Sequence, residues 1–242
     1  MDYIRSVKLE ELSDELDYAA KLPAVKSLAA ADELAFKSSV TYFVGENGTG
    51  KSTLLEAIAV KYGFNAEGGS LNFSFATKET HSPLHSAVKL VRGIERPKTG
   101  FFLRAESFYN AASYIDTLGS EILDAYGGRS LHEQSHGESF FSLVMNRFKG
   151  HGLYILDEPE AALSPSRQMS LLIRIKELAD KGSQFIIATH SPIVLACPDS
   201  VIYELTENGI AETEYEDTET YGVMKAFMDS PERMINHLFE KE

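Results

Sequence analysis

The stretch GENGTGKS, residues 45–52, matches the phosphate-binding motif G-x-x-x-x-G-K-[ST] at every fixed position. Glycines in such a loop let backbone N–H groups turn inward around a phosphate without obstruction by side chains. Lys51 is expected to contact the β- and γ-phosphates, and Ser52 is expected to offer its hydroxyl to Mg²⁺. The alternative is a glycine-rich turn that fits the motif by chance. The nucleotide-contacting residues expected here are Gly45, Glu46, Asn47, Gly48, Thr49, Gly50, Lys51, Ser52 and Thr53.

The residues around this phosphate loop have the strand–loop–helix pattern that such a loop requires. An apolar run, Val40–Val44, precedes it, and Thr53–Val60 follows with the composition and apolar spacing of a helix. Gly63 is placed to end that helix. The positive end of the helix would stabilise the negative charge of a triphosphate. This context favours nucleotide binding over a chance match.

A second apolar run, Leu153–Leu156, ends in two carboxylates, Asp157 and Glu158. Open α/β sheets place ligands at the carboxyl ends of their strands. Asp157 suits Mg²⁺ coordination, directly or through water, and Glu158 is placed to orient or deprotonate an attacking water. Pro159 then takes the chain off the strand. The alternative is a strand end with ordinary solvated acids.

A short turn, Ser135-His136-Gly137-Glu138, precedes an apolar helix expected over Ser139–Phe148. The free N–H groups and the dipole at the start of such a helix attract an anion. Ser135 as N-cap with Glu138 three residues later also forms a capping box. These residues alone therefore leave two roles open, a phosphate contact and a simple helix cap.

These motifs, in this order, resemble those of the ABC ATPase superfamily, and the resemblance extends from Val40 to about Glu216. It implies an α/β fold of the P-loop NTPase class, with a mostly parallel core sheet flanked by helices. It also implies an N-terminal antiparallel β part and an inserted helical lobe. In this family two ATP molecules, each with Mg²⁺, are sandwiched between two protomers, so the resemblance implies an ATP-dependent homodimer.

The resemblance gives the 135–138 turn the place of the family's signature motif. Ser135, Gly137 and Glu138 would then contact the ATP held by the other subunit. The turn departs from the family's usual Leu-Ser-Gly-Gly-Gln or Leu-Ser-Gly-Gly-Glu, because Gln134 replaces Leu and His136 replaces the first Gly. The His136 side chain would either hinder the approach of backbone to phosphate or donate a hydrogen bond to it.

The resemblance also implies roles for residues near other strand ends. His190, after the strand expected over Gln184–Ala188, resembles the switch histidine that contacts the γ-phosphate and holds the attacking water. Ala161-Ala162-Leu163-Ser164 occupies the place of the D-loop, a subunit-contact segment. The expected catalytic residues are thus Glu158, His190 and Lys51.

A third strand-like run, Gly100–Arg104, leads to the weakest match with the family. Glu106 stands near the position of the usual Q-loop glutamine, which links Mg²⁺ and water to the helical lobe. An ordinary exposed glutamate is the alternative, and Arg104 is either a nucleotide contact or a paired residue at the edge. The expected metal-binding residues are Ser52, Asp157 and Glu106.

The length and composition bound the organisation of the chain. Its 242 residues, 43% of them hydrophobic, suit one large α/β domain over 1–242, within which residues from about 65 to 150 form an inserted, mostly helical lobe that carries the signature turn. The single cysteine, Cys197, cannot form an internal disulfide and is expected to be a buried small hydrophobe. His81, His85 and His132 lack partners at metal-ligand spacing.

The charge and the hydropathy pattern exclude several classes of protein. A net charge of −13 argues against a generally basic coat for nucleic acid. The apolar runs are far shorter than the ~20 residues needed to span a bilayer, and the N-terminus lacks the pattern of a signal peptide. A cytoplasmic protein is therefore expected.

Further elements are expected from periodicity and turn residues. Tyr18 and Phe36 are candidates for stacking on adenine by position only, with core packing as the alternative. The other elements are a strand over Tyr3–Leu12, a strand pair over Leu34–Lys37 and Val40–Val44, helices over Ser107–Tyr126 and Ser166–Asp180, a hairpin of Val201–Leu205 and Ile210–Tyr215, and a helical C-terminus over Tyr221–Phe239.

These observations predict an ATP-hydrolysing protein that dimerises on ATP and drives or gates a soluble or nucleic-acid partner. The Glu in the signature turn and the absence of membrane segments are more similar to the chromosome-maintenance and defence branch of the family, which includes RecF-, Rad50- and SMC-type proteins, than to typical transporters. That likeness implies a role in DNA maintenance or defence. A nucleotide-binding subunit of a transporter, with a membrane permease encoded elsewhere, is one alternative. A module that binds ATP but scarcely hydrolyses it is another.

Overall fold

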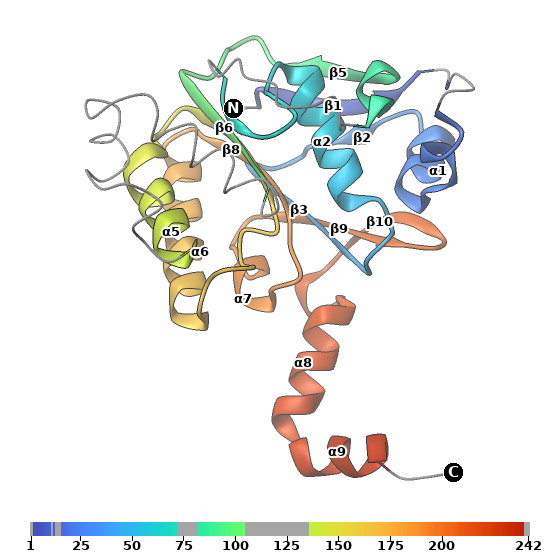
Figure 1. Ribbon diagram of the computed structural model, residues 1–242, viewed down its shortest axis with the longest axis vertical. Coiled ribbons are helices and arrows are strands. Elements are labelled where there is room, and N and C mark those ends of the chain that lie inside the picture. The colour runs from blue at the N-terminus through green and yellow to red at the C-terminus, as the bar shows by residue number, and fades with distance from the viewer. Residues whose placement is uncertain (1, 11, 13–15, 72–81, 105–135, 240–242) are drawn as a thin grey trace.

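A seven-stranded sheet forms the centre of the computed structural model, which describes residues 2–10, 12, 16–71, 82–104 and 136–239 (Figure 1). The strand order is β10-β9-β3-β8-β7-β6-β4. The strands from β9 to β6 run parallel, and the edge strands β10 and β4 are antiparallel to their neighbours. The predicted α/β class with a mostly parallel sheet is therefore confirmed. The strands are β3 (Val40–Gly45), β4 (Gly69–Ser70), β6 (Thr99–Arg104), β7 (Gly152–Asp157), β8 (Gln184–Ala188), β9 (Val201–Thr206) and β10 (Gly209–Thr213).

The central strands bury both of their faces. Tyr154 and Leu156 of β7 belong to one hydrophobic core, while the alternating Leu153 and Ile155 belong to the other. Side chains alternate across a strand, so a strand between two helical layers is apolar at every position. This is why β7 is a continuous apolar run that ends abruptly at Asp157.

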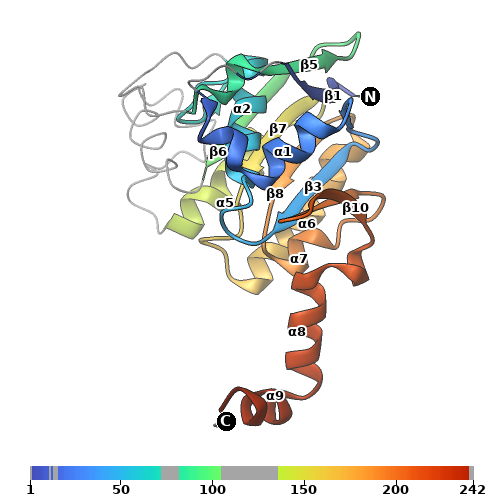
Figure 2. The same ribbon diagram turned by 90° about the vertical axis from the view of Figure 1, so that its right-hand side faces the viewer.

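Helices cover both faces of the sheet, as Figures 1 and 2 show. The helices α5 (His136–Arg147), α6 (Pro165–Asp180) and α7 (Pro192–Leu195) pack on one face, and α1 (Pro23–Ala30) and α2 (Lys51–Tyr62) pack on the other. The first residue of α1, α6 and α7 is proline, which is preorganised for a helix start. Single 3-10 turns span Ala19–Lys21, Pro83–Ser86 and Tyr215–Asp217.

A second, antiparallel sheet of order β2-β1-β5 covers the α2 side of the molecule. Its strands are β1 (Ile4–Leu9), β2 (Leu34–Ala35) and β5 (Val88–Arg92). This sheet confirms the predicted N-terminal antiparallel part. The prediction that Leu34–Lys37 pairs with Val40–Val44 is wrong, because β3 already has β8 and β9 on its two sides and β2 pairs with β1.

The predicted boundary of the inserted lobe at about residue 65 is also wrong. Val88–Arg92 pairs with β1, and Thr99–Arg104 pairs with β7 inside the main sheet. Phe101, Phe102 and Leu103 are buried there, so this stretch is core and not lobe. The helix predicted over 107–126 lies outside the described residues. The helix predicted over 139–148 is present as α5, which begins at His136.

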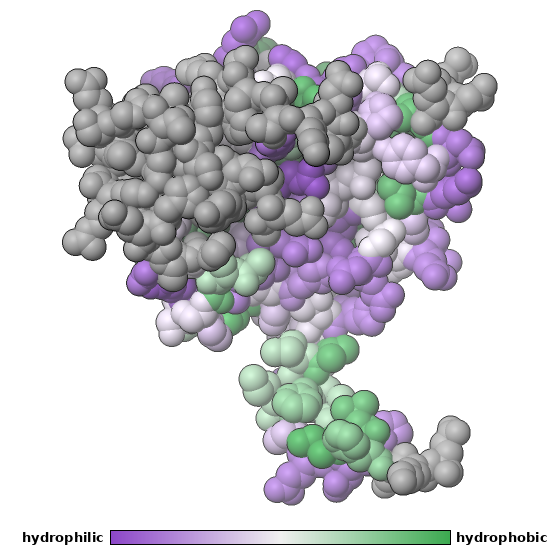
Figure 3. All heavy atoms as spheres, viewed as in Figure 1, coloured by the Kyte–Doolittle hydropathy of each residue, from purple (hydrophilic) through white to green (hydrophobic). Residues whose placement is uncertain are grey.

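The C-terminal helices α8 (Glu219–Asp229) and α9 (Pro231–Phe239) project from the body as an arm. Neither helix buries a residue, and Figure 3 shows apolar atoms along the arm. No helix among the described residues is both long and apolar enough to cross a membrane. The large apolar side chains exposed on this arm are Val223, Met224, Phe227, Met228, Ile235, Leu238 and Phe239.

Candidate nucleotide site

Neighbouring strands of the main sheet deliver the predicted site residues to one edge. The phosphate loop follows β3, His190 follows β8, and Asp157 ends β7, and these three strands are adjacent in the order β3-β8-β7. Parallel strands have their carboxyl ends at the same edge, which is where open α/β sheets bind ligands. The topology therefore brings together groups that lie more than a hundred residues apart in the chain.

The phosphate loop is braced by backbone contacts on two sides. Gly45 has φ 135°, and a Cβ atom there would lie 2.1 Å from the Leu205 carbonyl oxygen of β9, so the close approach requires glycine. The backbone N–H of Ala24, in the first turn of α1, donates to the Thr49 carbonyl at 3.0 Å. Helix α1, which the sequence did not predict, thus supports the loop.

Lys51 points back into the phosphate loop. Its Nζ donates to the carbonyl oxygens of Gly45 at 2.6 Å and Glu46 at 2.8 Å, and the side chain is buried. Burial lowers the pKa of Lys51, and the Glu158 and Asp157 carboxylates oppose that shift. A buried ammonium that donates to these two carbonyl oxygens can donate to phosphate oxygens in the same way, and hydrogen bonds between charged groups are the stronger ones.

Ser52 and Asp157 meet across the sheet edge. The Ser52 hydroxyl donates to Asp157 Oδ1 at 3.0 Å, and Asp157 is buried. A hydroxyl and a carboxylate are oxygen ligands of the kind that Mg²⁺ takes, and this metal usually completes its shell with water and substrate phosphates. The donor set therefore fits the magnesium ion that the phosphate-loop motif implies.

Glu158 and His190 lie next to each other beyond the strand ends. Glu158 has φ 51°, a left-handed conformation that is costly for a residue with a side chain, and its N–H donates to the Ala188 carbonyl at 2.9 Å. His190 Nε2 lies 3.8 Å from Glu158 Oε1, and both side chains are partly exposed. A carboxylate and an imidazole therefore lie side by side at the sheet edge that carries the phosphate loop.

Two family models match the segments that contain these groups. One is described as "AAA domain, putative AbiEii toxin, Type IV TA system" and matches residues 130–196. The other is described as "AAA domain" and matches residues 21–87. The first segment contains Asp157, Glu158 and His190, and the second contains the whole phosphate loop.

Two known proteins with similar sequences are named as ATP-binding proteins of import or transport. The ribose import ATP-binding protein RbsA of Yersinia pestis is 25% identical over 185 residues, which are 68% of this chain and 36% of RbsA. The branched-chain amino acid transport ATP-binding protein LivG of Archaeoglobus fulgidus, itself described as probable, is 26% identical over 75% of this chain and 80% of its own. The chain spans about a third of the length of RbsA.

A solved structure shares the fold at low identity. It is described as "an inward-facing conformation of a putative metal-chelate type ABC transporter", and it matches with a TM-score of 0.50 and 16% identity over 95% of this chain and 90% of that chain. The chain has the fold of ABC-type P-loop ATPase domains, and its sequence is similar to theirs. The two matched segments together contain the phosphate loop, Asp157, Glu158 and His190.

The predicted signature turn, residues 135–138, is only partly within the described residues. Ser135 lies outside them, whereas Gly137 is in the first turn of α5. A Cβ atom on Gly137 would lie 2.2 Å from the Ala162 carbonyl oxygen, so glycine lets α5 approach the predicted D-loop of the same chain. Glu138 pairs with Arg167 of α6 at 3.5 Å. The turn therefore contacts the segment that follows Glu158.

The structure describes Arg104, Phe36 and Tyr18 among the remaining candidates from the sequence. Arg104 forms a mostly buried ion pair with Glu56 of α2, so the paired role is the one present. Glu106 lies outside the described residues. Phe36 is buried against Phe43 and belongs to the core, whereas Tyr18 is 48% exposed. No group of His, Cys, Asp and Glu among the described residues has the arrangement of a metal cluster.

Sequence reasoning missed Glu160. Its carboxylate Oε1 accepts the backbone N–H of His190 at 2.6 Å, and its Oε2 is buried. Burial raises the pKa of the Glu160 carboxyl, and the hydrogen bond from His190 opposes the shift. The only signal in the sequence was a third acid after Asp157 and Glu158, and that pattern does not say which way the side chain turns.

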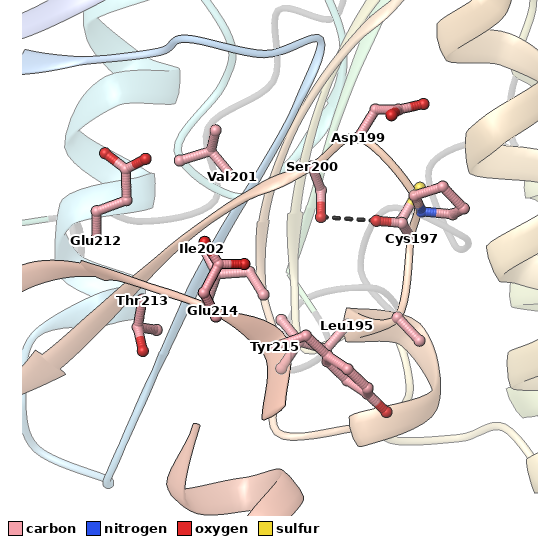
Figure 4. Close-up of a pocket in the computed structure, with 12 residues that line it drawn as sticks. Leu195, Cys197, Asp199, Ser200, Val201, Ile202, Glu212, Thr213, Glu214 and Tyr215 are labelled. Carbon is pink, nitrogen blue, oxygen red and sulfur yellow. Dashed lines mark hydrogen bonds between the residues drawn. The ribbon is translucent and has the colours of Figure 1, made fainter. Parts of the chain in front are cut away.

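A pocket of about 360 Å³ lies elsewhere, between residues 195–200 and the β9–β10 hairpin (Figure 4). None of its described lining residues belongs to the phosphate loop or to residues 157–160. Ser200 Oγ donates to the Cys197 carbonyl at 2.8 Å, and the Tyr215 hydroxyl donates to the Pro192 carbonyl at 3.0 Å. The pocket is therefore separate from the nucleotide site.

The Cys197 thiol is expected to resist alkylation in the native protein. Burial raises its pKa from 9.0 to about 11, so at pH 8 the folded protein has about 100-fold less thiolate than an exposed cysteine. Because the chain has one cysteine, the rate of labelling by iodoacetamide reports this site alone. Labelling should become fast in denaturant, and equal rates in native and unfolded protein would show that Cys197 is accessible.

Proposed function

We propose that this chain binds ATP with Mg²⁺ and hydrolyses it as one half of a homodimer that encloses two ATP molecules. The observation that carries the proposal is the convergence of the phosphate loop, the Ser52–Asp157 contact and the Glu158–His190 pair at one sheet edge. Phosphoryl transfer to water requires mainly positioning and charge stabilisation, and these groups supply both. The likeness to ATP-binding subunits supports the same activity.

Each group has a distinct task in the proposed reaction. Lys51 and the N-terminus of α2 would hold the phosphates, while Ser52 and Asp157 would hold a Mg²⁺ ion that offsets the negative charge of ATP. Glu158 orients or deprotonates the attacking water, and His190 contacts the γ-phosphate and keeps the water in place. The N–H groups at the start of α5 meet the ATP of the second copy.

Release of phosphate from ATP tests this activity directly. Wild-type protein is expected to release phosphate with ATP and Mg²⁺, and chelation of the metal by EDTA should reduce release to background. Release at background level with both present would instead favour an ATP-gated module with little turnover. The family model whose description refers to a toxin–antitoxin system makes that second outcome a specific alternative.

The partner that the ATPase drives or gates is proposed to be a soluble effector or a nucleic acid in the cytoplasm. A second candidate, the nucleotide-binding subunit of a transporter, is favoured by the names of the RbsA and LivG relatives. Affinity capture with the Glu158→Gln protein and ATP distinguishes them. Recovery of a membrane permease would support the transporter subunit, and recovery of nucleic acid or a soluble effector would support the first candidate.

Replacement of Ser135 by arginine is expected to block ATP-driven dimerisation without weakening ATP binding to the single chain. The residue precedes α5, whose start is proposed to meet the partner's γ-phosphate, and a long cation there would obstruct that contact. Sedimentation velocity with and without ATP measures dimerisation, and titration with a fluorescent ATP analogue measures binding. Equal loss of both would mean that the turn has a structural role.

A further inference from the structure

We propose that Glu160 is a positioning residue, whose carboxylate fixes the loop that carries His190 against the turn that carries Glu158. The inference rests on the ATP hydrolysis proposed above and adds a residue to that site. Neither Glu160 nor its contact with His190 follows from the motifs, because the motifs end at Glu158 and resume at Thr189.

The contact itself is short and joins two separate segments. Glu160 Oε1 accepts the His190 backbone N–H at 2.6 Å, and thirty residues separate the two in sequence. A carboxylate that accepts a backbone N–H forms a charge-assisted hydrogen bond, which is stronger than a neutral one. Because the carboxylate is largely buried, water competes poorly for the same N–H.

Hydrogen bonds of Gln168 connect the same two segments a second time. The Gln168 side chain, on α6, donates from Nε2 to the Leu163 carbonyl at 3.0 Å and accepts at Oε1 from the Ser191 hydroxyl at 2.7 Å. Ser191 in turn caps α7 by accepting N–H bonds from Ile193 and Val194. Residues 158–163 and 189–191 are therefore tied to each other at two points.

The turn between Glu158 and Leu163 transmits this constraint to the catalytic carboxylate. The Ala161 N–H donates to the Glu158 carbonyl at 3.1 Å, and the Leu163 N–H donates to the Glu160 carbonyl at 2.8 Å. Glu158 itself is held in a left-handed conformation. Glu160 therefore holds the backbone of both segments, the one that carries Glu158 and the one that carries His190. The two side chains of these segments approach each other to 3.8 Å.

Loss of the contact should affect turnover more than binding. The phosphate loop does not contact Glu160 through any hydrogen bond among the described residues, so ATP affinity should persist. A displacement of about 1 Å in a catalytic group costs about 100-fold in rate. The expected signature is therefore a lower kcat with little change in KM.

Glu160→Gln and Glu160→Met form a matched pair for the test. Both remove the charge and keep the length of the side chain, but only glutamine keeps an oxygen that accepts the His190 N–H. We expect Glu160→Met to lower kcat by about 10- to 100-fold with KM changed less than about threefold. Glu160→Gln should stay within about threefold of wild type in both constants.

A double-mutant cycle with His190→Ala tests whether Glu160 acts through the histidine. Glu160→Met should then cost clearly less in kcat in the His190→Ala background than in the wild-type background. The control is Glu204→Met, because Glu204 also accepts a backbone N–H, that of Glu219 at 3.1 Å, but lies on β9, outside the segments 158–163 and 189–191. Unchanged kcat in Glu160→Met, or losses that multiply with those of His190→Ala, would overturn the proposal.

Hydrogen exchange at the His190 amide separates this inference from the proposed activity. Glu160→Met should speed that exchange by about tenfold or more, and Glu160→Gln should leave it nearly unchanged, whether or not the protein turns over ATP. Exchange that is equal in both variants would overturn the positioning role. Absence of turnover in wild-type protein, with His190 protection lost only in Glu160→Met, would instead overturn the proposed activity alone.

Discussion

The Lys51→Ala protein is expected to bind ATP at least about 30-fold more weakly than wild type. Lys51 is buried, and its ammonium donates to the carbonyl oxygens of Gly45 and Glu46, which phosphate oxygens would replace. Truncating one partner of a buried charge pair typically costs about 2–5 kcal/mol. Isothermal titration with ATP and Mg²⁺ measures the loss, and wild-type affinity in Lys51→Ala would contradict the phosphate-binding role.

The control for this change is Lys61→Ala, in the last turn of the same helix. Lys61 lies at the opposite end of α2 from the phosphate loop, so its removal should leave ATP affinity unchanged. Burial lowers the pKa of Lys51, which means that the folded protein is destabilised by keeping this buried ammonium charged. Alanine has no charge to bury, so the substitution removes that destabilisation. The midpoint of thermal unfolding should therefore stay within about 4 °C of wild type in both variants.

The Glu158→Gln protein is expected to retain ATP binding and to lose about 100- to 10,000-fold in the rate of hydrolysis. Glutamine keeps the shape of the side chain but cannot accept the proton of the attacking water. The phosphate loop and the Ser52–Asp157 contact are untouched by the change, so ATP and Mg²⁺ should still bind. Single-turnover release of phosphate, compared with equilibrium binding, separates the two effects.

Glu207→Gln, at the exposed turn between β9 and β10, is the control for the loss of one carboxylate. It should hydrolyse ATP at the wild-type rate. If Glu158→Gln also did so, the water-activating role would have to lie with another residue. A loss of binding that matched the loss of hydrolysis would mean that Glu158 serves to hold the nucleotide.

The parts of the site that the sequence predicted are those whose signals are local. The phosphate loop needs glycines, a lysine and a hydroxyl in one short run, and the strand and helix beside it follow from composition. The β7 strand was predictable because burial on both faces leaves it apolar until Asp157. The fold class follows from the alternation of such strands with helices.

The parts that failed depend on contacts between distant segments. Leu34–Ala35 pairs with β1 because both edges of β3 are taken by strands that come much later in the chain. Strand β5 was placed in a lobe for the same reason, since its partner is β1. The Glu160–His190 contact depends on how the turn after β7 folds, and the spacing of residues does not encode it.

The mass of the Glu158→Gln protein, measured by light scattering with and without ATP and Mg²⁺, tests the ATP-sandwich dimer most directly. Slow hydrolysis should trap the closed state, so ATP is predicted to double the mass relative to nucleotide-free protein. Glu158→Gln combined with Lys51→Ala should show no such change. A mass that stays the same at saturating ATP, in protein shown to bind it, would contradict the dimeric mechanism.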